Sequence, residues 1–354
     1  SGGGWIDNYK MNVPSTAGLA VGQTVGNAFL PAGTYIRRIL SGTQIELSHK
    51  STSEAGETGQ TVTFGALSAP CAQTVNEVYL AGSASAVSVT PGGAETTLAF
   101  GNVSGPGGLV KSGAGALRLT GSVTHGGTNT ISAGTLDFAG AGLTLLTNAV
   151  PGGGTFRHSG GGTTVVDAAA ASINTFSGPV VVDGGALQHG TANANQRRGL
   201  SNASSYTVNA GATMIATRDS MRDNVPYNLN GGTLKMLKGF QHLGTLTLNG
   251  GPLATGPGQG GPYQAFALGG NVAVTGNVPS VIRAEPGTHN GVHLAFNAAA
   301  GVLRTFRVED VTGDAAADLT VSAALLESSH TGNSAGLIKT GAGRFILNGT
   351  ATNG

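Results

Sequence analysis

A glycine-rich segment occurs twice in the chain, first at Gly108–Gly121 and again at Gly336–Gly349. Both copies have Leu at the second position, Lys at the fourth, Gly at the sixth and eighth, and apolar residues at the tenth and twelfth. A shorter element, in which an apolar residue, any residue, Ala or Gly, and then Gly follow one another, recurs between the copies. It starts at Ile131, Val182, Val208, Leu229 and Leu248, with a looser form at Val150. Such repeats indicate a stack of similar structural units.

The spacing of the shorter element predicts the size of one unit. Successive starts lie roughly 20–30 residues apart, which is the length of one coil of a β-solenoid. The Ala-Gly or Gly-Gly pair would form the corner, because Gly adopts positive φ without steric cost. Leu117 and Leu119 share one face of a strand, and Arg118 lies on the other. We therefore expect an all-β chain with a right-handed parallel β-helix over residues 107–354 and almost no α-helix.

The composition agrees with many short strands and tight turns. Gly accounts for 61 of the 354 residues, while 10% of residues are charged and 5% are aromatic. The net charge of +1 and the small clusters of Lys and Arg give no nucleic-acid footprint. Cys71 is the only cysteine, which excludes an internal disulfide and a multi-cysteine metal site. No apolar run reaches the roughly 18 residues of a membrane-spanning helix.

The longer repeat, together with Ile131–Leu136 after it, resembles the autotransporter-associated β-strand repeat, also called the passenger-associated transport repeat. The pattern of that family is Gly-Leu-x-Lys-x-Gly-x-Gly-x-Leu-x-Leu-x-Gly, a variable turn, and apolar-x-Ala-Gly-Thr-Leu. The first copy covers residues 107–138 almost completely, and the second begins at residue 335 and stops before its turn is finished. The resemblance implies a β-helical extracellular passenger and carries no catalytic residues.

The N-terminal part of the chain lacks these repeats. We expect an extended segment over residues 1–14, a small β module over 15–66, and a linker with the first coils over 67–106. Alternation predicts two strands in the module, with inward residues Ile45, Leu47, Val62 and Phe64. The module resembles small β modules of phage tail-fibre and bacterial surface proteins.

Histidines and carboxylates are the candidate metal ligands of the chain. His289 and His293 form the closest histidine pair, but no Glu follows the first and the surroundings are Gly-rich, so we expect loop histidines. Asp310, Asp314 and Asp318, with Glu309, form the densest acidic stretch. Their spacing does not match an EF-hand loop, so a solvated turn is the preferred interpretation, with calcium as the alternative. We predict no metal and no cofactor.

Candidates for catalysis are equally sparse. Ser334 lies in a Gly-x-Ser-x-Gly sequence, but a repeat strand follows it where a nucleophile elbow needs a helix. Ser159 next to His158 is a chain neighbour and not a triad. Gly256–Gly261 matches a dinucleotide fingerprint only formally, since prolines interrupt it. The best residues for a carbohydrate-cleaving groove are Arg218, Asp219, Arg222 and Asp223, which read more naturally as a mixed-charge surface loop.

The sequence is compatible with three functions. The preferred one is a non-catalytic structural segment of a secreted bacterial surface protein, with flanking repeats of a longer chain or other copies of itself as partners. The first alternative is a carbohydrate-binding or carbohydrate-cleaving β-helix module, with surface polysaccharide as its partner. The second is an adhesin that binds through the 15–66 module.

Solenoid ends expose unpaired backbone groups, and this suggests head-to-tail assembly into filaments. The chain starts without Met, so we expect a processed product or an interior fragment. If it is a natural unit, stacking of one molecule on the next would satisfy both edges. The candidate assembly edges are Trp5, Ile6, Met11 and Val13 at one end and Arg344, Phe345, Ile346 and Leu347 at the other.

Overall fold

The computed structural model describes residues 2–7, 9–52, 59–67, 72–89, 97–168, 175–191, 198–260, 263–295, 301–328 and 334–349. Within these residues all regular elements are β-strands, and no helix long and apolar enough to span a membrane is found among them. The described chain divides into two compact units. The first unit contains the described residues up to Thr74 together with those of Val89–Ala99 and Gly113–Ala116. The second contains the described residues of Val75–Ser88, Phe100–Ser112 and Leu117–Gly354.

The N-terminal unit is built from antiparallel strands. Its five-stranded sheet has the order β4-β5-β2-β1-β6, and β3 pairs with β7. The bounds are β1 (Gly2–Asp7), β2 (Lys10–Asn12), β3 (Gln23–Gly26), β4 (Ile36–Ser41), β5 (Gln44–Leu47), β6 (Gln60–Thr61) and β7 (Thr63–Leu67). Its core consists of Met11, Val13, Val25, Ile36, Ile45, Leu47 and Val62, and Phe64 packs against it. The inward residues expected from alternation are therefore found in or against this core.

Within the expected extended segment over residues 1–14, residues 2–7 and 10–12 form strands β1 and β2 of the module's sheet. Strand β2 pairs with both β1 and β5, so that Met11 lies opposite Ile45 in the middle of the sheet. The alternation of Lys10, Met11 and Asn12 buries Met11 and leaves Asn12 exposed. The beginning of the chain is thus an integral part of the module.

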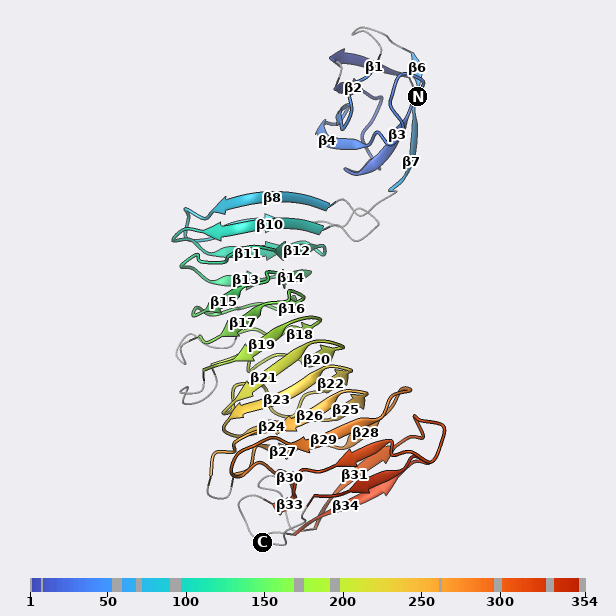
Figure 1. Ribbon diagram of the computed structural model, residues 1–354. Coiled ribbons are helices and arrows are strands. Elements are labelled where there is room, and N and C mark those ends of the chain that lie inside the picture. The colour runs from blue at the N-terminus through green and yellow to red at the C-terminus, as the bar shows by residue number, and fades with distance from the viewer. Residues whose placement is uncertain are drawn as a thin grey trace. The chain divides into compact units, whose positions relative to one another are not determined.

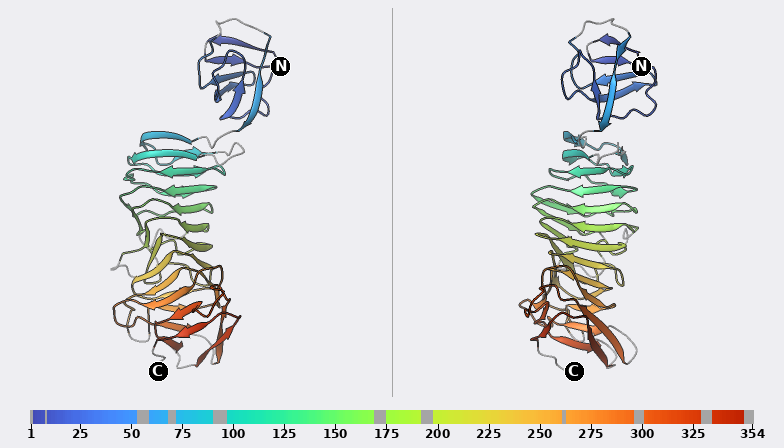
Figure 2. Two further views of the ribbon diagram at one scale, coloured as in Figure 1. Left: turned by 45° about the vertical axis from the view of Figure 1, so that its right-hand side comes forward. Right: turned by 90° about the vertical axis from the view of Figure 1, so that its right-hand side faces the viewer.

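The larger unit is a parallel β-solenoid, as expected from the repeats (Figure 1). One side of its coils is a twelve-stranded sheet, whose strands lie above one another as parallel rungs in both views of Figure 2. These strands are β8 (Ala72–Tyr79), β10 (Thr97–Ser104), β12 (Ala116–Leu119), β14 (Thr135–Phe138), β16 (Thr155–His158), β18 (Pro179–Val182), β20 (Ser205–Asn209), β22 (Tyr227–Asn230), β25 (Leu246–Asn249), β28 (Val272–Val274), β31 (Val302–Val308) and β34 (Ala335–Thr340).

The second side is a nine-stranded sheet that begins only at β15. It consists of β15 (Leu143–Leu146), β17 (Thr163–Val166), β19 (Ala186–His189), β21 (Thr213–Thr217), β23 (Thr233–Lys238), β26 (Pro252–Thr255), β29 (Ser280–Ala284), β32 (Leu319–Val321) and β35 (Phe345–Leu347). The third side has two shorter sheets: β9 (Ser85–Ser88), β11 (Leu109–Ser112) and β13 (Asn129–Ile131), then β24 (Gln241–Leu243), β27 (Phe266–Leu268), β30 (Val292–Ala295) and β33 (Leu325–Ser328).

Exact register between coils stacks like residues inside the solenoid. One interior column of the twelve-stranded sheet runs through Leu136, Phe156, Val180, Tyr206, Tyr227, Leu246, Val272 and Phe306. The rings of Phe138 and Phe156 stack at 5.0 Å, and those of Tyr206 and Tyr227 at 4.9 Å. Burial of this column against the other sides supplies the hydrophobic stabilisation of the rod.

The predicted corners are confirmed by the backbone. Each short element contains one Gly with positive φ, namely Gly134, Gly185, Gly211, Gly231 and Gly250. The apolar residue that starts each element, from Ile131 to Leu248, is buried. Alternation after the corner is confirmed as well, since Leu117 and Leu119 are buried and Arg118 is exposed.

Some corner glycines are required by the spacing between coils. A Cβ on Gly162 would lie 2.1 Å from the Gly142 carbonyl oxygen, and one on Gly185 would lie 2.2 Å from the Gly162 carbonyl oxygen. Such distances lie far inside van der Waals contact, so backbone itself would have to move. This column of backbone against backbone accounts for part of the high glycine content.

We predict that Gly162→Ala destabilises the solenoid by about 2 kcal/mol, because the new methyl group forces neighbouring coils apart. The adjacent Gly161 is a matched control, since a Cβ there meets nothing within 4 Å. Gly161→Ala should change stability by less than about 1 kcal/mol. Urea denaturation of both variants checks this, and equal midpoints would show that the coil spacing does not require Gly162.

Candidate functional site

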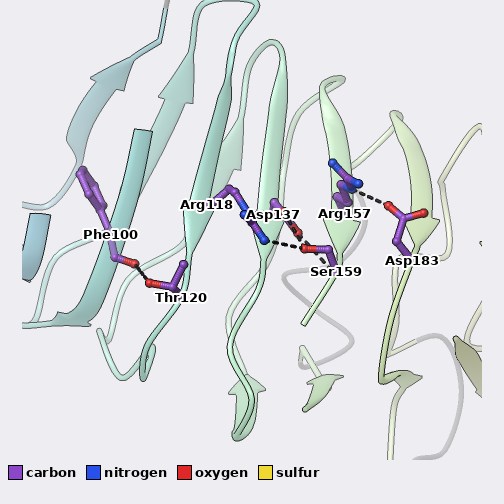
Figure 3. Close-up of polar contacts among 7 residues, drawn as sticks. All are labelled: Phe100, Arg118, Thr120, Asp137, Arg157, Ser159 and Asp183. Atoms are coloured by element: carbon purple, nitrogen blue, oxygen red, sulfur yellow. Dashed lines mark hydrogen bonds and ion pairs between the residues drawn. The ribbon is translucent and has the colours of Figure 1, made fainter. Parts of the chain in front are cut away.

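Charged side chains line the outer face of the twelve-stranded sheet, where Figure 3 shows them on successive coils. Arg118 on β12 donates from Nε to Oδ2 of Asp137 on β14 at 3.1 Å. One coil further on, Arg157 on β16 donates to Asp183, which follows β18, at 2.5 Å. We call Arg118, Asp137, Arg157 and Asp183 the charged ladder. Each of its ion pairs joins one coil to the next.

Ser159 completes the first half of the charged ladder. Its hydroxyl donates to Asp137 Oδ2 at 2.8 Å, and its backbone N–H donates to Asp137 Oδ1 at 3.1 Å. Both carboxylate oxygens of Asp137 are thereby satisfied, and the residue is only 1% exposed. At the end of the charged ladder that Asp183 forms (Figure 3), Asn209 donates to the Asp183 carboxylate. Asn230 in turn donates to the Asn209 side-chain oxygen at 3.1 Å.

The charged ladder has the properties of a structural element. General acid and base catalysis on a glycoside needs two carboxyl groups that face one substrate bond. Asp137 and Asp183 instead alternate with arginines, which hold both carboxylates in ion pairs. We expect these partly buried ion pairs to specify the register of neighbouring coils more than to add to stability.

The four groove candidates lie in the loop between β21 and β22. Arg222 donates from Nη1 to the carbonyl of Asn202 at 3.0 Å, which fastens the loop. Asp223 accepts from Gln241 Nε2 at 3.2 Å and lies 3.5 Å from His242 Nδ1. Asp219 has a positive φ of 44° and sits in a turn with Arg218. Their polar contacts tie the loop between β21 and β22 to the solenoid.

The acidic stretch differs from the expected solvated turn at one residue. Asp318 is buried, and its Oδ1 accepts from the backbone N–H groups of Val311 and Thr312, each at 2.8 Å. Its Oδ2 accepts from the backbone N–H of Arg344 at 2.6 Å. Burial opposes ionisation, but these hydrogen bonds outweigh it and the pKa of Asp318 is lowered. Asp318 therefore organises the loop from within, while Asp310 and Asp314 cap exposed turns.

The histidine pair is split between two environments. His289 lies in a loop with a positive φ of 57°, whereas His293 lies buried on β30. The expectation of two loop histidines is thus wrong for His293, because it lies on a strand and its side chain is buried. Within the described residues no cluster of three or more His, Cys, Asp or Glu could hold a metal ion.

The two serine candidates lie in different surroundings. Ser334 is exposed directly before β34, as the repeat predicts. Ser159 bonds to Asp137 and not to its neighbour His158. The His158 ring is buried, with Nε2 3.2 Å from the Gly162 carbonyl oxygen and Nδ1 3.2 Å from Thr164 Oγ1. Burial lowers the pKa of His158 despite these partners.

The assembly-edge residues lie in different surroundings. Met11 and Val13 are core residues of the N-terminal module, so they do not form an open solenoid edge. Trp5 and Ile6 belong to β1, but their side chains lie outside the described part of the structure. Phe345, Ile346 and Leu347 form β35, the last strand of the nine-stranded sheet, directly after Arg344.

A polar network inside the solenoid escaped the sequence patterns. The His189 ring is fully buried and accepts at Nδ1 from the backbone N–H of Leu200 at 3.2 Å. The Tyr206 hydroxyl donates to the Leu200 carbonyl at 2.7 Å and accepts from the Arg222 N–H at 2.7 Å. Burial lowers the pKa of His189 to about 3 and raises that of Tyr206. These side chains fasten the long turns before β20 and β22 to the interior.

Three segments match the family model of the passenger-associated transport repeat: residues 109–138, 156–188 and 337–353. The chain thus carries this repeat at both places where the sequence pattern resembles it, and at a third between them. The repeat is structural and not catalytic, and it is associated with autotransporter passenger domains. Comparison with curated proteins and with solved structures finds no match.

The third residue of each match lies on a strand, but not on the same side of the solenoid: β11 belongs to the three-stranded sheet, and β16 and β34 belong to the twelve-stranded sheet. The matches begin at residues 109, 156 and 337, so Lys111, His158 and Lys339 are each their third residue. Lys111 is buried and donates to the carbonyls of Ser112 at 2.8 Å and of Ala133 at 3.0 Å, the latter in the next coil. Burial lowers the pKa of Lys111 to about 8. Lys339 is exposed and donates to the Gly341 carbonyl at 2.5 Å.

We predict that Lys111→Ala lowers the free energy of unfolding by about 2–3 kcal/mol, because it leaves a cavity and an unpaired Ala133 carbonyl. Lys339→Ala is the control at the equivalent, exposed position and should change stability by less than about 0.5 kcal/mol. Thermal and urea unfolding measure both. A Lys111→Ala variant as stable as Lys339→Ala would contradict the role of Lys111 as a bond between coils.

Proposed function

We propose that this chain is a non-catalytic structural segment of a secreted bacterial cell-surface protein, and that it serves as a rod within the passenger. The observation that carries the proposal is the presence of three passenger-associated transport repeats in one stack of parallel coils. Flanking repeats of a longer chain are its natural partners, since a solenoid grows by addition of coils that each contact only their neighbours.

The side chains support the same proposal. Apolar columns in register fill the interior, and the side chains of the charged ladder form ion pairs with one another between coils. These features stiffen a rod, and none of them prepares a reacting group. Preorganised catalytic sites instead hold charged groups toward a substrate position.

Protease treatment of intact cells of the native source tests the surface location. We expect an antibody against the solenoid to stain intact cells and externally added protease to remove that staining. A cytoplasmic protein in the same cells, as the control, should survive the treatment. Protection of the solenoid until the cells are lysed would contradict a surface protein.

An assay for released reducing ends tests the absence of catalysis. We expect no release from common plant and bacterial polysaccharides. Activity that is lost in Asp219→Asn or Asp223→Asn would favour the carbohydrate-cleaving alternative instead.

Head-to-tail assembly is a finer proposal, and light scattering on concentrated protein tests it. On β35 the Arg344 carbonyl accepts from the Leu319 N–H, and the Asn348 N–H donates to the Val321 carbonyl. Alternate residues of a parallel strand bond to the same neighbour, so the Ile346 N–H also points toward β32. A proline at Ile346 would therefore disturb the solenoid itself and is a poor probe of assembly. Leu347→Pro acts on the outer side of β35 and is the appropriate variant. Particles that stay monomeric in the wild type would rule out the filament.

A further inference from the structure

The nine-stranded sheet starts abruptly inside the solenoid. Its first strand, β15, pairs with β17 alone among the described strands, while the twelve-stranded sheet continues past that level to β12 and β10. The segment of the preceding coil on this side, residues 121–127, forms no strand and makes no backbone hydrogen bond to β15. One long edge of β15 therefore faces no strand of the part of the chain that the structure describes.

The hydrogen-bond pattern identifies which groups face that edge. Thr163 N–H donates to the Gly142 carbonyl at 3.1 Å, and Asp167 N–H donates to the Leu146 carbonyl at 2.9 Å. In a parallel ladder the residues that bond to one neighbour alternate with those that face the other side. The N–H and C=O groups of Leu143 and Leu145 thus point to the open edge, and no partner for them occurs among the described residues.

The same two residues carry exposed apolar side chains. Leu143 is 72% exposed and Leu145 is 51% exposed, while Thr144 and Leu146 point inward and are buried. Residues 139–156 contain no Asp, Glu, Lys or Arg. Natural edge strands are normally protected by charges, prolines or bulges, and β15 has none of these.

We propose that β15 is a docking edge for an extended strand of a partner protein, uncharged and with apolar side chains at alternating positions. The strand would take up the free N–H and C=O groups of Leu143 and Leu145 and would become a new first strand of the nine-stranded sheet. Its alternating apolar residues would cover the two leucine side chains. This surface goes beyond the structural role and does not depend on it.

The geometry favours a single strand over a second solenoid. The twelve-stranded sheet continues past β14 to β12, β10 and β8, so β15 starts its own sheet part of the way along the stack and not at its end. A second solenoid would have to fit its whole cross-section beside these coils, whereas one extended peptide occupies only the width of a strand, roughly 4.8 Å.

Fluorescence anisotropy with a labelled peptide tests the proposal. The probe is a short peptide of alternating valine and threonine, with lysines only at its ends for solubility. We expect saturable binding to the full chain, and a loss of affinity by a factor of about ten or more in Leu145→Pro, because proline removes a donor and blocks the edge. The Leu145 N–H is not used in the ladder to β17, so the fold should be retained.

Two further variants keep the test decisive. The double variant Leu143→Lys, Leu145→Lys should lose binding similarly, because edge lysines oppose strand addition; it replaces Leu145→Pro if that variant does not fold. Val278→Lys changes another exposed apolar residue, which lies outside the strands, and should bind like the wild type. Absence of saturable binding, or equal binding by the folded β15 variants, overturns the proposal. A wild-type dimer that Leu145→Pro abolishes overturns it in favour of a second copy.

Discussion

Phe156→Ala is expected to lower the free energy of unfolding of the solenoid by about 3–5 kcal/mol. Phe156 has no exposed surface, and its ring stacks on Phe138 at 5.0 Å and meets the edge of Phe176 at 6.5 Å. The register also places it between Leu136 and Val180 of adjacent coils. The cavity would therefore lie between coils, where the stacked strands prevent collapse around it.

Urea denaturation followed by circular dichroism measures the effect. Tyr79→Ala is the control, since it removes another aromatic ring that is 68% exposed. We expect the control to change stability by less than about 0.5 kcal/mol. If Phe156→Ala were equally mild, the interior of these coils could not be packed as the structure shows.

Acidification is expected to destabilise the solenoid through buried His189. Burial lowers the pKa of His189 to about 3 in the folded protein, against about 6.5 in an unfolded chain. Below pH 6.5 the unfolded chain thus binds a proton that the folded protein does not bind, and stability falls with falling pH. The loss approaches 1.4 kcal/mol per pH unit well below pH 6.5 and amounts to about 2 kcal/mol between pH 6.5 and pH 4.5.

Denaturation at a series of pH values measures this slope. His189→Gln should reduce the slope by about 1.4 kcal/mol per pH unit, because its side chain does not titrate. His289→Asn alters an exposed loop histidine and should retain the wild-type slope. Lowered pKa values at His158 and Asp318 also cost stability in acid, the second only at lower pH, near the pKa of a free carboxyl group. A His189→Gln variant with an unchanged slope would contradict the burial of this ring.

The solenoid was predictable because its signals are local. A Gly pair at a corner and an apolar residue two positions before it are set within a few residues, and the structure confirms them from Ile131 to Leu248. The middle transport repeat was missed, since His158 occupies the place of the lysine and Thr164 that of a leucine. The imidazole nevertheless lies buried beside a corner carbonyl, much as Lys111 does.

Features that depend on distant partners were not predictable. Residues 10–12 read as an extended segment, and only their pairing with β5 shows that Met11 belongs to the module core. Asp318 looked solvated, because the N–H of Arg344 that binds it comes from another coil. The open edge of β15 follows from the absence of a strand at residues 121–127, which no local pattern at Leu143 and Leu145 reveals.

The register between β17 and β19 tests the stacked-coil architecture most directly. Thr163 lies opposite Ala186, and both side chains point outward. In a Cys71→Ser background, cysteines at 163 and 186 should form a disulfide on mild oxidation, because adjacent parallel strands bring paired Cα atoms within about 5 Å. Cysteines at 163 and 188 are shifted by two residues and should not cross-link efficiently. Preferential cross-linking of the shifted pair, or of neither pair, would contradict the parallel β-solenoid.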